Sequence, residues 1–222
     1  MSRRCYQLLA RLLFLTLVLL ADRRIFADDW PAPQIITRFS ESGEYFIRIY
    51  PGKSWGDSFG FAGAAKGPYA KAEFFRKQAD KSYQLAWERN LVNPVSPVDV
   101  LVTNSGAIFT LDNWHNTGYG KIVALYTSQG ALLRSYELKD LYPEDRISKI
   151  DHSVSSRHWR KGAFGFVDPA AQTKIYVSDC FLNTFVFEVQ TGRYVYELNP
   201  AKKQPDQYCE LQASVAPEAG RL

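Results

Sequence analysis

The stretch VLVTNSGAIFTLD, residues 100–112, and the stretch GKIVALYTSQGALLRSYEL, residues 120–138, decide the fold class. Each contains two short runs rich in Val, Ile, Leu, Phe and Tyr, residue types that favour strands. The runs are separated by N-S-G and by S-Q-G, which are typical turn sequences of β-hairpins. We therefore expect four consecutive antiparallel strands between residues 98 and 138.

Similar runs extend this pattern over most of the chain. Residues 70–76 (AKAEFFR) fit either a strand or the start of a helix, and the glycine-rich residues 52–68 predict a long loop. Helical periodicity is confined to residues 138–141. The sequence therefore predicts an all-β fold, with strands at 44–50, 83–91, 98–103, 107–112, 121–126, 132–138, 163–167, 174–178, 185–189 and 194–198.

A weak internal repeat supports this fold class. Residues 121–138 contain a strand, an S-Q-G turn and a strand that ends in Tyr-Glu-Leu, and residues 183–198 repeat this order with Q-T-G at the turn. Residues 71–88 fit a third copy, with its turn at 78–81. The spacing of about 50 to 60 residues lies near the repeat length of propeller blades.

These segments resemble the blades of NHL- and YVTN-type β-propellers. The resemblance implies a propeller-like array of about three to four antiparallel blade-sized sheets, small, open or incomplete, since closed propellers have about four to eight blades. A β-sandwich of similar hairpins is the alternative. The segments LDNWHN (111–116) and SVSSRHW (153–159) also resemble an exported bacterial family without assigned activity, and that resemblance supplies no mechanism.

The first 27 residues predict a cleavable signal peptide. A basic segment, residues 1–11, precedes ten apolar residues at 12–21, about half of the roughly twenty that a spanning helix needs. Cleavage after Ala27 would leave residues 28–222 as a single β-rich domain, periplasmic or secreted. Cleavage after Ala21 and an uncleaved anchor are the alternatives.

The positive charge of the chain lies in this leader. The chain has 27 Lys and Arg against 23 Asp and Glu, and five of these Arg and one of these Asp fall within residues 1–27. Residues 28–222 therefore carry 22 charges of each sign. This balance predicts no nucleic-acid partner, and no membrane contact beyond export.

The cysteines fit an exported protein. Cys5 lies in the leader, which leaves Cys180 and Cys209 in the predicted domain. In an oxidising compartment an even pair predicts a Cys180–Cys209 disulfide, which would stabilise the fold by about 3 kcal/mol. One buried and one exposed thiol is the alternative.

Two polar segments contain all three histidines, and both lie between predicted strands, where sites are usually built. They are DNWHNTGYG (112–120) and DHSVSSRHWR (151–160). Their aromatic rings and cationic side chains suit a pocket for a small polar ligand or a protein. The candidate ligand-binding residues are Trp114, His115, Tyr119, Arg157, His158, Trp159 and Arg160.

A second hypothesis places a zinc or copper ion in the same segments. Neither an HExxH motif nor a CxxC pair is present, so the sequence identifies no definite cofactor. A structural role is the third interpretation, since Asp and Asn cap turns and Trp is commonly a core residue. The candidate metal ligands are His115, His152, His158, Asp112 and Asp151.

These observations favour an exported, non-catalytic binding module that recognises its ligand through aromatic, His and Arg side chains on loops. A metal-dependent hydrolase or lyase outside the cytoplasm is the first alternative. A structural subunit whose incomplete propeller is completed by self-association, and which is therefore a homo-oligomer, is the second.

Overall fold

The computed structural model describes residues 30–201. The chain divides into two compact units, residues 1–30 and 31–222, and all the described elements belong to the second unit. The predicted signal peptide, residues 1–27, lies outside the described residues. Within residues 30–201, none of the helices has the length and apolar character needed to cross a membrane.

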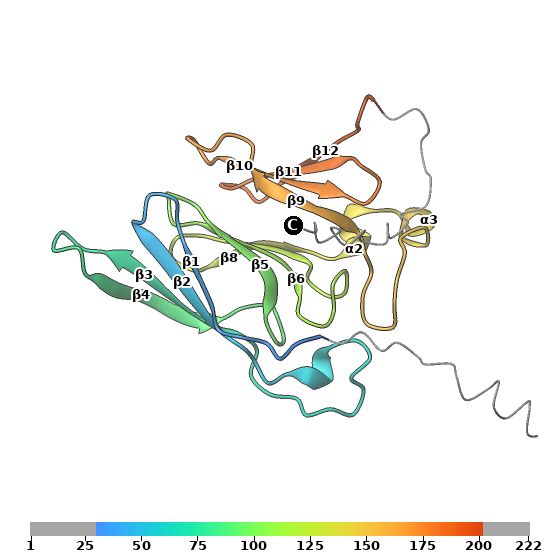
Figure 1. Cartoon of the computed structure of the whole chain (residues 1–222), viewed down its shortest axis with the longest axis horizontal. Helices are drawn as coiled ribbons and strands as arrows, with labels where there is room; N and C mark the ends of the chain where they lie inside the picture. The colour runs from blue at the N-terminus through green and yellow to red at the C-terminus, as the bar shows by residue number, and fades with distance from the viewer. Residues whose placement is uncertain (1–29, 202–222) are drawn as a thin grey trace, which may run out of the picture. The chain divides into compact units, whose positions relative to one another are not determined.

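Twelve strands in the described residues form three four-stranded antiparallel sheets, in which each strand pairs with its neighbours in sequence (Figure 1). The first sheet contains β1 (Ile36–Phe39), β2 (Tyr45–Tyr50), β3 (Lys71–Lys77) and β4 (Tyr83–Asn90). The middle sheet contains β5 (Pro97–Val102), β6 (Ile108–Asn113), β7 (Val123–Tyr126) and β8 (Leu132–Tyr136). The last sheet contains β9 (Arg160–Phe166), β10 (Lys174–Asp179), β11 (Thr184–Glu188) and β12 (Tyr194–Glu197).

Short helices occupy two of the connections. The 3-10 helix η1 (Trp55–Asp57) lies in the long loop between β2 and β3, and α2 (Leu138–Leu141) and α3 (Glu144–Ile147) follow β8. The predicted helical turn at residues 138–141 is therefore confirmed, whereas α3 and the first strand, β1, were not predicted.

The middle sheet is buried on both faces because it lies between the other two (Figure 1). Successive side chains of a strand point to opposite faces, so β6 and β7 supply two separate cores. One core joins the middle sheet to the first sheet, and the other joins it to the last sheet. Ile108, Ala124 and Tyr126 belong to the former, and Phe109, Leu111, Val123 and Leu125 to the latter.

The internal repeat corresponds to the outer half of each sheet. Its three copies form the hairpins β3–β4, β7–β8 and β11–β12, the third and fourth strands of the three sheets. Residues 71–77 are a strand because Ala72 and Phe74 enter the core between the first and middle sheets. The all-β, propeller-like array is confirmed with three described sheets that do not close into a ring, and the two-sheet sandwich is excluded.

An aromatic side chain of each of the first two sheets bonds to the outer turn of the next sheet, the turn between its third and fourth strands. Trp87 of β4 donates its indole N–H to the carbonyl of Ser128 at 3.0 Å, and the Tyr136 hydroxyl of β8 donates to the carbonyl of Gly192 at 2.7 Å. Gly130, at φ +77°, lies so close to Trp87 that a Cβ would approach its ring to 2.7 Å. Glycine is therefore required in this turn for both its conformation and its size.

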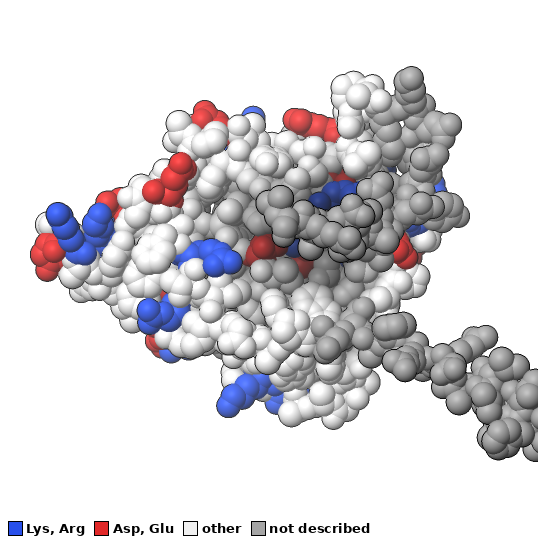
Figure 2. All heavy atoms as spheres, viewed as in Figure 1, with Lys and Arg blue, Asp and Glu red and all other residues white. Residues whose placement is uncertain are grey.

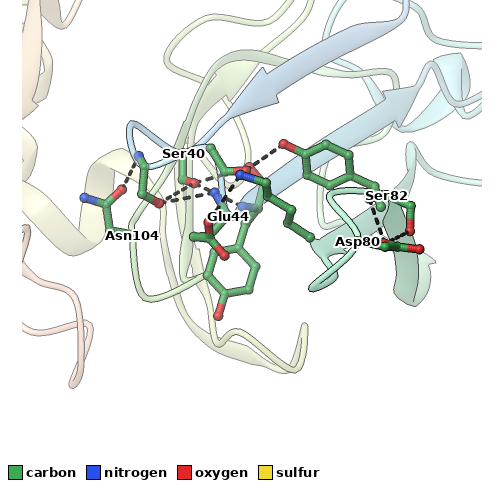
Figure 3. A network of polar contacts seen from close by, with 10 residues as sticks. Ser40, Glu44, Asp80, Ser82 and Asn104 are labelled. Atoms are coloured by element: carbon green, nitrogen blue, oxygen red, sulfur yellow. Dashed lines mark hydrogen bonds and ion pairs between the residues drawn. The ribbon is translucent and has the colours of Figure 1, made fainter.

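The first turn of each sheet meets the others at one end of the array. The amide of Ser42 donates to Asn104 Oδ1 at 2.8 Å, which joins the β1–β2 turn to the β5–β6 turn (Figure 3). The amide of Asn104 in turn donates to Gln172 Oε1, and Gln172 Nε2 donates to Glu41 Oε2 at 2.8 Å. These bonds connect all three sheets.

Candidate functional site

The polar segment that ends β6 forms a buried lock rather than an open site. Asp112 is fully buried at φ +57°. Its carboxylate accepts hydrogen bonds from the Gly118 amide at 3.0 Å, from Trp159 Nε1 at 2.7 Å and from Arg160 Nε at 2.6 Å. Arg160 also forms an ion pair with Asp99 at 2.6 Å. We name Asp99, Asp112, Trp159 and Arg160 the Asp112 lock.

This lock joins the end of the middle sheet to the beginning of the last sheet. Burial lowers the pKa of Arg160, but the charges of Asp112 and Asp99 outweigh that effect, so the net shift of the Arg160 pKa is upward. Trp159 is fully buried in the core shared by these two sheets. The polar atoms of the lock bind one another, which favours the structural interpretation of Asp112, Trp159 and Arg160.

The three histidines lie in different surroundings. His115, at φ +63°, packs against Trp55 and Phe61 with ring-centroid distances of 4.9 and 5.6 Å, and burial lowers its pKa. His152 is exposed and forms an isolated bridge with Arg157. The amide of His158 donates to the carbonyl of Asp151 at 2.9 Å.

The predicted metal ligands do not come together. Within residues 30–201, which include all five of them, no group of three or more His, Cys, Asp or Glu side chains is placed to hold a metal ion. His115 lies among aromatic rings, while Asp112 is occupied in the lock. The described residues therefore offer no site for the predicted zinc or copper.

The two remaining predictions concern Trp114 and the cysteines. Trp114 Nε1 donates to the carbonyl of Pro31 at 3.1 Å, so this ring holds the segment that leads into β1. Cys180 is buried, and its amide donates to the carbonyl of Trp159 at 2.8 Å. Cys209 lies outside the described residues, and the disulfide stays a prediction.

An open cleft of about 570 Å³ lies beside Tyr119. Its walls come from the long β2–β3 loop, the β4–β5 connection, the β6–β7 loop and Glu137 after β8, segments that are distant in sequence. The side chains that give it chemical character are Asp57, Phe59, Tyr69, Tyr119, Lys121 and Glu137.

The β2–β3 loop is held in place by backbone contacts and by one amide side chain. Gly52 donates to the carbonyl of Val95 at 2.7 Å, and a Cβ there would approach the Pro94 oxygen to 2.2 Å, so only glycine fits. Asn116 of the β6–β7 loop exchanges two hydrogen bonds with the Phe59 backbone, at 2.6 and 3.0 Å. These bonds fix the loop across the cleft.

A stack of flat groups forms one wall of the cleft. The rings of Phe59 and Tyr119 are nearly parallel, at 7°, with centroids 4.5 Å apart. The Arg157 guanidinium lies 5.7 Å from the Tyr119 centroid, and Arg157 Nη1 donates to the carbonyl of Ile147 at 3.0 Å. Phe59 is nevertheless 55% exposed. An exposed ring held in a fixed orientation is a surface on which a ligand can stack.

The two carboxylates of the cleft are stabilised in their ionised forms. A hydrogen bond from Ser54, with help from Lys66 at 3.3 Å, lowers the pKa of Asp57. Hydrogen bonds from Lys121 and Lys139, both at 2.8 Å, lower the pKa of Glu137. The cleft therefore offers two anionic groups near neutral pH, one of them paired with Lys121 on the cleft wall.

Tyr119 and Arg157 of this region were candidates from the sequence, whereas the other cleft residues were not: Asp57, Phe59, Tyr69, Lys121 and Glu137. One available signal was the length of the 52–68 loop, because long loops within compact domains are commonly functional. No sequence motif links this loop to Lys121 or Glu137, which the fold alone brings to the cleft.

Comparisons with known proteins leave the family open. No family model matches the sequence, and no curated protein matches it. Among solved structures, the chain is similar to the C-terminal WD40 domain of Sif2 at 14% identity and a TM-score of 0.33. The match covers 79% of this chain and 41% of that one, so the chain spans less than half of that structure's length.

Proposed function

We propose that the protein is an exported, non-catalytic binding module whose cleft takes a small saccharide. The observation that carries this proposal is the Phe59–Tyr119 stack, which presents a half-exposed ring beside charged groups. A sugar ring has an apolar face that packs on an aromatic ring and hydroxyls that bond to carboxylates and ammonium groups at its edge. Phe59 would supply the first contact, and Asp57, Lys121 and Glu137 the second.

The size of the cleft fits this ligand class. Small-molecule pockets commonly measure about 300 to 1,000 Å³, and the cleft of about 570 Å³ lies within that range. Figure 2 shows scattered groups of both charge signs on the face in view, separated by uncharged side chains. Recognition by ring stacking and hydrogen bonds suits such a surface better than attraction to one strongly charged partner.

The state of the carboxylates favours binding over catalysis. Glycoside hydrolysis usually requires one carboxylic acid that keeps its proton near neutral pH, which means a raised pKa. The pKa values of Asp57 and Glu137 are both lowered. Neither group is therefore suited to act as a general acid at neutral pH. The exported location rests on the leader, residues 1–27.

Calorimetry on the purified protein tests the proposal, with a panel of neutral di- and trisaccharides and a panel of tripeptides of similar size. We expect saccharide binding, and we expect Phe59→Ala to weaken it about two- to tenfold, since ring stacking contributes about 0.5–1.5 kcal/mol. Leu132→Ala removes an exposed apolar side chain of β8 that does not line the cleft, and should leave binding unchanged.

Phe59→Ala should still unfold in one cooperative thermal transition, lowered by only a few degrees through loss of the Tyr119 stack, which separates loss of binding from loss of fold. Binding of tripeptides without saccharides would replace the proposed ligand class with peptides. Absence of binding in both panels, or an unchanged affinity in Phe59→Ala, would overturn the proposal.

A further inference from the structure

The outward face of the first sheet carries an apolar row that crosses all four strands. Phe39, Phe46, Phe75 and Leu85 are successive partners in the strand register. Ring centroids are 5.0 Å apart for Phe39 and Phe46 and 4.4 Å for Phe46 and Phe75. These residues belong to neither of the two cores, and Phe39 and Leu85 are 56% and 46% exposed. We name them the aromatic row.

The outward face of the last sheet carries a row in which three of the four residues are small. Gly165, Tyr176, Val186 and Val195 are successive register partners across its four strands. The Tyr176 ring lies over Gly165, where a Cβ would approach it to 3.3 Å. Val195, at the outer edge, is 61% exposed. We name these residues the small row.

The two rows are the opposite ends of one stack of sheets. The middle sheet turns one face to the sheet before it and the other to the sheet after it. The aromatic row lies on the face of the first sheet that corresponds to the face by which the middle sheet contacts the first. The small row lies on the face of the last sheet that corresponds to the face by which the middle sheet contacts the last. The two outward faces therefore correspond to the two partners of each sheet-to-sheet contact already made within the chain.

We propose that a second copy of this chain covers both faces, with the small row of each copy packed on the aromatic row of the other. Such a head-to-tail contact closes into a ring when the rotation between subunits permits. Two copies would supply six sheets, which lies within the usual range of about four to eight blades in a closed propeller.

The features of the internal contacts continue into these outward faces. In the small row only Tyr176, whose ring covers Gly165, is bulky, so the Phe and Leu side chains of the aromatic row can pack on the smaller Val186 and Val195 beside it. The outer turn of the first sheet has Lys81 at φ +67°, similar to Gly130 at +77° and Gly192 at +68° in the turns that the preceding sheet holds.

Charged groups accompany both rows. The Arg48 guanidinium lies 5.9 and 5.8 Å from the ring centroids of Phe46 and Phe75. Glu188 and Glu197 lie on the face of the small row, opposite in strand register to Lys174 and Thr184. A carboxylate of one copy is thereby available to the Arg48 of the other.

Light scattering of the purified protein tests this proposal. We expect about twice the mass of one chain, which is 25.3 kDa with the leader included. Leu85→Arg in the aromatic row and Val195→Arg in the small row should each halve that mass. Val154→Arg is the matched control, because Val154 is a 74% exposed loop residue on neither face. Circular dichroism and thermal unfolding verify that each variant is folded.

Mixing the two interface variants distinguishes the head-to-tail contact from other arrangements. An equimolar mixture of Leu85→Arg and Val195→Arg retains one intact aromatic row and one intact small row, so dimers should reappear. A Val195→Arg protein that remains dimeric would show a contact between two first sheets and overturn the head-to-tail arrangement. A single-chain mass for the wild type would overturn the proposal altogether.

Discussion

The Asp112 lock and the cleft use similar side chains for different ends. Both combine carboxylates, cations and aromatic rings, and both draw on the segment between β6 and β7. In the lock, Asp112 and Trp159 are fully buried and each polar group has a partner within the protein. In the cleft, Phe59 and the carboxylates remain open to solvent.

A dense cluster of polar and aromatic side chains is therefore not by itself a sign of a binding site. The segment 151–160 has the stronger sequence signal, with two His, two Arg and a Trp, yet its Trp159 and Arg160 hold two sheets together. A buried charge must be paired, which demands such residues for structural reasons alone. The two clusters differ in how far their side chains are exposed to solvent.

The largest effect is expected from Asp112→Ala. Removal of the carboxylate leaves Arg160 charged and mostly buried with one of its two partners, and it orphans the Trp159 and Gly118 N–H groups. Loss of one partner of a buried ion pair costs about 3–5 kcal/mol. Chemical denaturation measures the free energy of unfolding. Asp57→Ala, in the open cleft, should destabilise far less, and an equal loss would contradict the distinction between the clusters.

A smaller loss is expected from Trp159→Phe. This change keeps an aromatic ring in the core between the middle and last sheets but removes the indole N–H that donates to Asp112. Asp112 keeps its bonds from Gly118 and Arg160, so the loss is that of one hydrogen bond to a charged group, about 1.5–3 kcal/mol. The comparison variant is Trp87→Phe, whose N–H donates to a carbonyl in a partly exposed turn. If both variants lose the same free energy, burial does not set the value of these bonds.

The smallest effect is expected from Glu137→Gln, and it should depend on pH. Because the folded-state pKa of Glu137 lies below its ordinary value of 4.5, its ion pairs stabilise the fold above that pH. This contribution is lost as the pH falls through the lowered pKa. For exposed pairs it amounts to about 0.5 kcal/mol.

Denaturation of the wild type and of Glu137→Gln should therefore differ at neutral pH and converge in acid. High salt should also reduce the difference, because it screens exposed pairs. A difference that persists under acidic conditions would mean that Glu137 acts through packing rather than through charge.

The local pattern of the chain predicted most of the strands. Alternating or continuous apolar runs between Gly- and Asn-containing turns identified ten strands, because these signals arise from the strand itself and from its turns. Residues 70–76 stayed ambiguous because their pattern fits two periods. The core contacts of Ala72 and Phe74 explain why residues 71–77 form a strand. β1 is short and half-exposed, so its apolar pattern is weak.

The candidate site was less predictable for a physical reason. Asp57, Lys121 and Glu137 are ordinary surface residues in sequence. Only the packing of separate segments brings them to one cleft, where Lys121 pairs with Glu137 and Asp57 pairs with Lys66 of its own loop. Tyr119 could be identified because it is an aromatic residue of the polar segment 112–120, which lies between two predicted strands. Phe59 could not, because its exposure follows from the bonds that Asn116 makes to its backbone.

The all-β class, the hairpins and the repeated outer half of each sheet follow from local sequence, because turn conformation and strand alternation depend on neighbouring residues. Tertiary structure alone decided which polar residues became a buried lock and which line an open cleft. The packing of the three sheets also places the aromatic row and the small row outside both cores. Burial depends on which sheets pack together, and that is a property of residues far apart in the chain.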